Sequence, residues 1–165
     1  MLAAALTAIF AADACVDRLE LPWLLGGALD EPAHLATALL VLANVPAPAP
    51  AWAAGYAAGS VAVDADHLPL VPVHRTITRE TPRPPAHTLL APFGLAAAAA
   101  FARPPARQAL LGAAAGTCVH FLRDVATGSG LAPLKPLAGF RVRLPRAGYY
   151  AAMALLAARA WRTAG

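Results

Sequence analysis

The chain has 165 residues, of which 59% are hydrophobic and only 13% are charged. Its mean hydropathy of +0.56 is typical of a membrane protein, since a soluble globular domain usually carries about 25% charged residues. A water-soluble fold of this length needs more polar surface to cover its core, so the composition argues against an ordinary soluble domain. The net charge of +4 does not by itself indicate nucleic acid binding, and we predict no nucleic acid partner.

The N-terminal half predicts three helices. The first, over residues 1–18, has no basic segment before its apolar run, and Asp13 breaks that run, so we interpret it as a helix that stays in the protein and not as a cleaved signal. Residues 32–63 contain no Asp, Glu, Lys or Arg. Because proline breaks helices, the sequence PAPAP at 46–50 predicts a tight turn between two shorter helices there.

The C-terminal half predicts three more. An uncharged stretch over 84–102 predicts a fourth helix, and a fifth follows over 107–126, ended by TGSG at 127–130. The last is expected over 147–162. Strand signals are scarce, so the predicted fold class is all-α: one domain over 1–165, forming a multi-pass membrane bundle of about five to six short helices.

The ionisable residues are not scattered along this chain. If the helices alternate in direction, the connections at 15–30, 64–86 and 127–146 emerge on one side of the bundle. Ionisable groups at membrane depth are costly and therefore indicate function. Those that lie near helix ends on this side predict one shared site: His34, Asp64, Asp66, His67, His87, His120 and Asp124.

The spacing of these residues indicates metal binding. His120 and Asp124 are four positions apart and project from one helical face, and Glu31 and His34 have the Glu-x-x-His spacing of metal-binding bundles. Imidazole and carboxylate ligands suit a divalent metal, zinc or manganese. There are more candidates than one tetrahedral zinc needs, so we expect one or two ions.

Some of these residues also have simpler interpretations. Asp30 could cap a helix whose first turn contains Pro32. His34 could be a packed core histidine, and His74, in a basic loop, is expected to be solvated. The acidic residues of the first helix look like an interfacial helix end and receive no role: Asp13, Asp17 and Glu20.

Taken together, the motifs resemble the YdjM-like family of membrane-bound, metal-dependent hydrolases. The resemblance runs from His34 to the last helix, and its parts are D-x-D-H at 64–67, R-x-x-x-H at 83–87 and H-x-x-x-D-x-x-T-x-x-G from 120 to 130. The family's Thr-His-Ser reads Ala-His-Thr at 86–88 here, which puts a hydroxyl hydrogen bond before His87 in doubt.

The resemblance implies a hydrolase that activates water with a metal. The implied ligands are His34, Asp66, His67, His87, His120 and Asp124, with Asp64 bridging or orienting a ligand and Glu31 acting as general base or further ligand. The family's pattern is in turn similar to that of zinc-dependent phospholipases C and nucleases, which implies a phosphoesterase.

The basic residues predict the substrate and the topology. Arg75 and Arg83 beside the metal motifs suit an anionic or phosphorylated group, and a site at the membrane surface suggests membrane lipids as partners. The excess of arginine on the motif side predicts that this site in the cell membrane faces the cytoplasm. Two alternatives stay open at this point: an ion or proton transporter, and a non-catalytic scaffold with a structural metal.

Overall fold

A computed structural model describes residues 2–19, 21–70, 72, 86–127, 130–135, 137 and 139–164. This part of the chain contains six α-helices, one 3-10 helix and an isolated β-bridge between Leu131 and Val142. The all-α prediction is confirmed. The helices are α1 (Leu2–Arg18), α2 (Trp23–Leu42), α3 (Pro50–Val61), the 3-10 helix η1 (Ala62–Leu70), α4 (Leu90–Phe101), α5 (Ala106–Thr127) and α6 (Arg146–Ala164).

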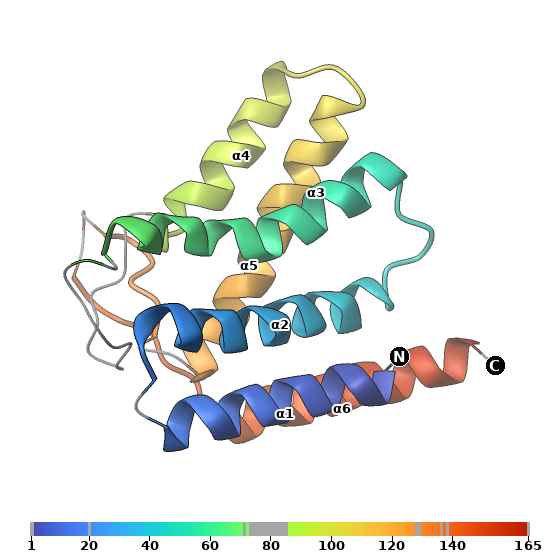
Figure 1. The fold of residues 1–165 in the computed structure, drawn as a ribbon. Helices are drawn as coiled ribbons and strands as arrows, with labels where there is room; N and C mark the ends of the chain where they lie inside the picture. Colours follow the sequence, from blue (N-terminus) through green and yellow to red (C-terminus); the bar gives the residue numbers. More distant parts are fainter. Residues whose placement is uncertain are drawn as a thin grey trace.

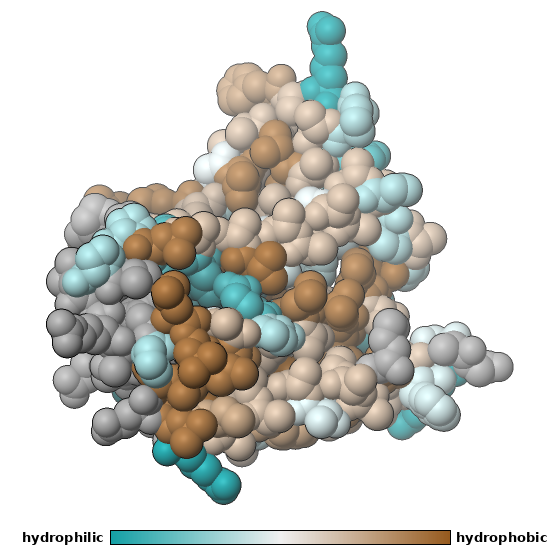
Figure 2. Space-filling model, viewed as in Figure 1, coloured by the Kyte–Doolittle hydropathy of each residue, from teal (hydrophilic) through white to brown (hydrophobic). Residues whose placement is uncertain are grey.

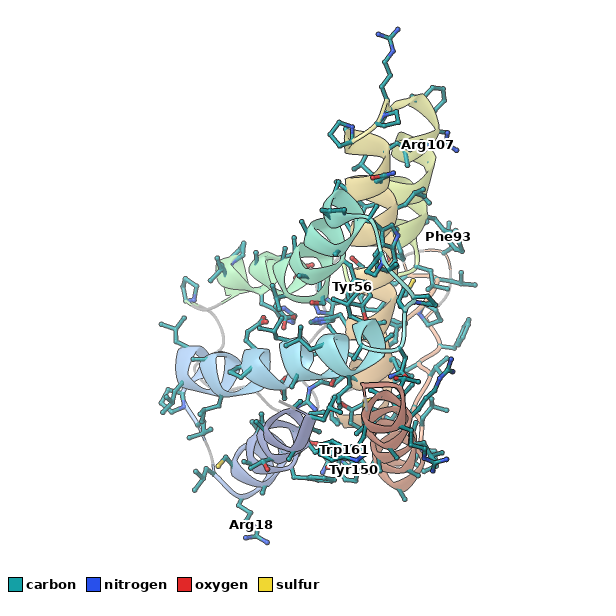
Figure 3. The ribbon with its side chains drawn as sticks, turned by 90° about the vertical axis from the view of Figure 1, so that its right-hand side faces the viewer. Arg18, Tyr56, Phe93, Arg107, Tyr150 and Trp161 are labelled. Atoms are coloured by element: carbon teal, nitrogen blue, oxygen red, sulfur yellow. The ribbon has the colours of Figure 1, made fainter. Side chains whose placement is uncertain are left out.

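Two sets of helices meet at α2 (Figure 1). On one side α1 and α6 pack against it, and their shared core includes the buried side chains of Ile9, Leu40 and Met153. On the other side lie α3 and α5, with α4 packed along α5. Tyr56 (Figure 3) joins α3 to α2, because its buried hydroxyl donates a 3.0 Å hydrogen bond to the carbonyl of Ala38.

Helices α3 and α5 are in direct backbone contact. Their facing glycines are spaced four apart on each helix, at Gly55 and Gly59 of α3 and at Gly112 and Gly116 of α5. A Cβ atom at Gly59 would lie 2.2 Å from the carbonyl oxygen of Ala113, and one at Gly116 only 2.1 Å from that of Tyr56. Glycine is therefore what allows the two backbones to approach so closely.

The ends of several helices meet on one side of the molecule, as predicted (Figure 1). The chain turns back between Leu42 and Pro50, where PAPAP predicts a turn, and α5 ends at Thr127, where TGSG predicts its end. The predicted start of the fourth helix at residue 84 is wrong, since α4 begins at Leu90. Backbone N–H groups of the residues before α4 donate to acceptors in other parts of the chain. The N–H of Ala86 donates to Asp66, and that of Leu89 donates to the carbonyl of Pro133.

The DEP sequence at 30–32 does not begin a helix, contrary to the capping interpretation. Helix α2 already starts at Trp23, directly after Pro22, and Pro32 lies inside it. Asp30 and Glu31 therefore project from the middle of α2, one turn before His34. They are available to neighbouring helices and do not cap α2.

The described surface carries many large apolar side chains (Figure 2). Among the most exposed are Phe101 at 92%, Trp161 at 75% and Phe93 at 65%, and Phe93 points away from the body of the molecule (Figure 3). None of the helices in the described ranges combines the length and the apolar character needed to cross a membrane.

Candidate metal centre

Histidines and aspartates from four parts of the chain converge beside the middle of α2. We call these six residues the His/Asp cluster: His34 of α2, Asp64 and His67 of η1, His87 just before α4, and His120 and Asp124 of α5. Asp64 is partly exposed and the other five are buried. Their ligand atoms form three overlapping groups, each within 4.8 Å: His34, Asp64 and His120; Asp64, His67 and His87; and His87, His120 and Asp124.

His120 faces the cluster with one ring nitrogen and is anchored by the other. Its Nδ1 lies 2.9 Å from the carbonyl oxygen of Ser60, on the facing helix α3. Its Nε2 lies 3.4 Å from both Asp64 and Asp124 but makes no hydrogen bond within the described part of the chain. The close contact of α3 with α5 thus fixes this ring with Nε2 directed at two carboxylates, an arrangement common among metal-binding histidines.

His87 is held in the same way. Its Nε2 lies 2.9 Å from Asp64 and 3.6 Å from Asp124, while its Nδ1 lies 3.3 Å from Asp66. Asp66 also accepts the backbone hydrogen bond of Ala86, which holds the segment carrying this histidine.

His67 and Asp66 come from the same 3-10 helix. The Nδ1 atom of His67 lies 3.2 Å from Asp64 and 3.3 Å from Asp66. Asp66, predicted as a ligand, is not a member of the three groups of ligand atoms. It contacts His67 and His87 at nitrogen atoms, which is the position of a residue that orients ligands.

His34 stacks on His120, with ring centroids 3.8 Å apart and an angle of 13° between the ring planes. Its Nε2 lies 3.3 Å from Asp30 and 4.0 Å from Asp124. Its Nδ1 is buried and has no hydrogen-bond partner among the residues described. His34 is thus 1% exposed, yet only one of its two ring nitrogens has a polar partner among the residues described.

The charges around the cluster favour a cation. Burial opposes a charge on His120, but the carboxylates of Asp124 and Asp64 outweigh burial and raise its pKa to about 10. Burial would likewise raise the pKa of Asp66, but hydrogen bonds from His67 and His87 lower it to about 2. A positive charge placed between these carboxylates is therefore stabilised.

Glu31 lies at the edge of the cluster with different chemistry. Burial, and then its hydrogen bond with Asp64, raise the pKa of Glu31 to about 8. Its Oε2 atom is buried and has no hydrogen-bond partner in the described ranges. A carboxyl group that changes charge near neutral pH can serve as a general base or acid.

Four of the ionisable residues discussed above lie outside the described residues: Arg75 and Arg83, expected to bind substrate, His74, expected to be solvated, and Glu20, to which no role was assigned. The expected arginine rim of the site therefore stays a prediction.

One buried ionic group beside the cluster was not expected from the sequence. Arg123 is fully buried, and its Nη2 atom donates to Asp13 of α1 at 2.6 Å and to Asp30 of α2. Asp13 also accepts a 2.7 Å hydrogen bond from the hydroxyl of Tyr150 on α6. In the sequence, this group is indicated only by charged residues within apolar helices. From the sequence we interpret Asp13 as part of a helix end and the arginines as a topology signal.

Comparison with protein-family models, with curated proteins and with solved structures finds no match to this chain. The resemblance to the YdjM-like family therefore stays a prediction that depends on the motifs alone.

Proposed function

We propose that this protein is a metal-dependent hydrolase that works at a membrane surface. One observation carries the proposal: four buried histidines and two aspartates from separate parts of the chain form three overlapping groups of three residues, and within each group the ligand atoms lie within 4.8 Å of one another. Burying imidazole rings and carboxylates costs free energy unless these groups are paired or bind a common metal ion.

The donor atoms fit a divalent metal. His120 Nε2 and His34 Nδ1 are buried ring nitrogens without hydrogen-bond partners in the part of the chain described. Imidazole nitrogen and carboxylate oxygen are the usual ligands of zinc, and manganese accepts them too. Because Asp64, His87 and His120 each belong to two of the three groups, the cluster offers enough ligands for one ion or for two that share a carboxylate.

A bound divalent metal lowers the pKa of water enough to supply hydroxide near neutral pH. Glu31, in its ionised form, would accept on its buried Oε2 atom the proton that such a water releases, and its raised pKa makes it the stronger base. Asp64, between three histidines, holds the ligand rings in place: its carboxylate lies within 3.4 Å of a nitrogen of each. Among the described residues no cysteine belongs to the groups of ligand atoms, and the hydroxyl of Ser60, whose carbonyl contacts His120, donates to the carbonyl of Ala57 at 2.8 Å. Water, not a side chain, is therefore the proposed nucleophile.

The exposed apolar surface supports work at a membrane. Large contiguous apolar patches on a protein surface mark contact with lipid or with a partner. The paired glycines of α3 and α5, four apart on both helices, are also the packing pattern found between helices in membranes. We propose membrane lipids as partners, with the site on the cytoplasmic side, and the multi-pass arrangement stays a prediction from composition.

The proposed substrate is an anionic, phosphorylated group, in first place the phosphoester of a lipid. The carboxylates of the cluster favour a cation, so an anionic substrate would meet a complementary charge there once metal is bound. Arg75 and Arg83, adjacent in sequence to the metal motifs, would add guanidinium groups that match phosphate oxygens.

The test is hydrolysis by the full chain reconstituted in lipid vesicles, loaded with zinc or manganese and offered phosphoesters and carboxylic esters. We expect cleavage of phosphoesters that disappears with a chelator and in Glu31→Gln, while the variant keeps its metal. Cleavage of carboxylic esters alone would contradict the phosphate assignment. Inactivity on both panels at full metal occupancy would favour a non-catalytic scaffold with a structural metal.

A further inference from the structure

The ring of His34 is oriented by a residue outside the His/Asp cluster. Its Nε2 atom lies 3.3 Å from Oδ2 of Asp30, one helical turn earlier on α2. Its other nitrogen, Nδ1, is buried without a hydrogen-bond partner among the described residues. Because a neutral imidazole has one N–H, a carboxylate that accepts from Nε2 leaves the lone pair on Nδ1.

His34 and His120 therefore present opposite nitrogens. His120 is anchored at Nδ1 by the carbonyl of Ser60, which leaves Nε2 for the cluster. His34 is anchored at Nε2 by Asp30 at 3.3 Å, with Asp124 farther from that nitrogen at 4.0 Å, and its ring stacks on that of His120 at 3.8 Å. In both rings one nitrogen is held by the protein and the other has no hydrogen-bond partner among the residues described.

Asp30 itself is fixed from the far side. Arg123, fully buried, donates from Nη2 to Oδ1 of Asp30 and also to Oδ1 of Asp13, the latter at 2.6 Å. Tyr150 on α6 holds the second oxygen of Asp13 at 2.7 Å. A continuous polar chain thus runs from α6 through α1 and α5 to the histidine on α2.

We propose that Asp30 is a positioning residue for the metal centre: held by Arg123, it fixes the His34 ring so that Nδ1, not Nε2, binds the metal. The inference rests on the proposed metal centre and deepens it. A carboxylate that accepts from the far nitrogen of a ligating histidine sets its tautomer and increases its basicity, and loss of such a partner lowers metal affinity by about 10- to 100-fold.

The chain offers a matched pair of variants for the test. Asp30→Asn and Asp13→Asn each remove one carboxylate charge from the same nitrogen of Arg123, but of these two aspartates it is Asp30 that contacts His34. Zinc affinity of the purified full chain is measured by competition with a chromophoric chelator. We expect about a 10- to 100-fold loss for Asp30→Asn and little change for Asp13→Asn. Wild-type affinity in Asp30→Asn, or equal losses in both variants, would overturn the proposal.

A second measurement needs no variant at residue 30. Nitrogen-15 NMR of the histidines in zinc-loaded wild type, with His34 assigned by comparison with His34→Gln, should show His34 metal-bound at Nδ1 and protonated at Nε2. Metal binding at Nε2 would overturn the proposal even if Asp30→Asn does not fold.

Both measurements read binding and not turnover, so they separate this inference from the proposed function. A zinc-loaded protein that hydrolyses nothing, but shows the Nδ1 signature and the affinity difference, supports the inference and contradicts the hydrolase. A wild-type protein that binds no zinc overturns both.

Discussion

Arg123 is a fully buried arginine whose charge is balanced by two carboxylates. It is fully buried, its Nη2 atom is shared by two carboxylates, and its Nε and Nη1 atoms have no hydrogen-bond partner in the described ranges. Removal of one member of a buried ionic group leaves the others uncompensated in a medium of low polarity. The three residues therefore depend on one another for stability.

We predict that Arg123→Met lowers the free energy of unfolding by about 3–5 kcal/mol, because it leaves Asp13 and Asp30 without their cation. The control is Arg107→Met at an exposed position of α5, where we expect a change within about 0.5 kcal/mol. Denaturant unfolding followed by circular dichroism measures both. Equal stability of the two variants would show that the buried ion pairs contribute nothing.

Local spacing was enough to predict some site residues and not others. His120 and Asp124 lie one helical turn apart on α5, so their pairing could be predicted from the sequence, and their 3.4 Å contact agrees with it. The contact of Asp13 with Arg123 joins residues 110 positions apart. No periodicity of one helix carries that information, since it depends on how α1, α2 and α5 pack.

At the scale of helices, the contact of α3 with α5 positions the His/Asp cluster. Across this contact, the hydroxyl of Thr117 donates to the carbonyl of Gly59 at 3.2 Å. His120, one turn further along α5, contacts the carbonyl of the next residue of α3, Ser60. A change in the distance between these two helices would move His120 away from Asp64, which follows α3 on η1.

We predict that Gly59→Ala lowers the free energy of unfolding by about 1–3 kcal/mol, because the added methyl group would overlap the backbone of Ala113. Gly94→Ala in α4 is the matched control, since nothing lies within 4 Å of its added Cβ, and alanine favours a helix by up to about 1 kcal/mol over glycine. Thermal unfolding of the two variants should therefore shift in opposite directions. A stabilised Gly59→Ala would contradict the close backbone contact.

Helix boundaries were predictable where proline or glycine fixes the backbone locally. PAPAP lies in the turn between α2 and α3, and α5 ends at Thr127, the first residue of TGSG, since proline and glycine break a helix whatever its surroundings. The start of α4 was not predictable, because it depends on Asp66 and on the carbonyl of Pro133, which bind N–H groups from other parts of the chain. The glycines that join α3 to α5 were present in the sequence as two G-x-x-x-G patterns, and we did not use them.

The whole molecule combines a buried polar centre with an apolar exterior. The His/Asp cluster lies inside the helices, while side chains such as Phe93, Phe101 and Trp161 are exposed. The scarcity of strand signals predicted the all-α fold and the composition predicted a membrane protein, but neither carries information on how the helices are placed relative to a bilayer. The membrane and the reaction are therefore proposals, and the metal is the claim on which both depend.

Elemental analysis of the purified full chain tests that claim most directly. After exposure to zinc and removal of excess metal, we expect about one or two ions per wild-type chain, and a clear loss in His120→Ala, because His120 belongs to two of the three ligand groups. His74→Ala, changed outside the cluster, should keep the wild-type content, and circular dichroism should show that all three proteins are equally helical. Wild-type protein without metal, or equal metal content in wild type and His120→Ala, would contradict the account.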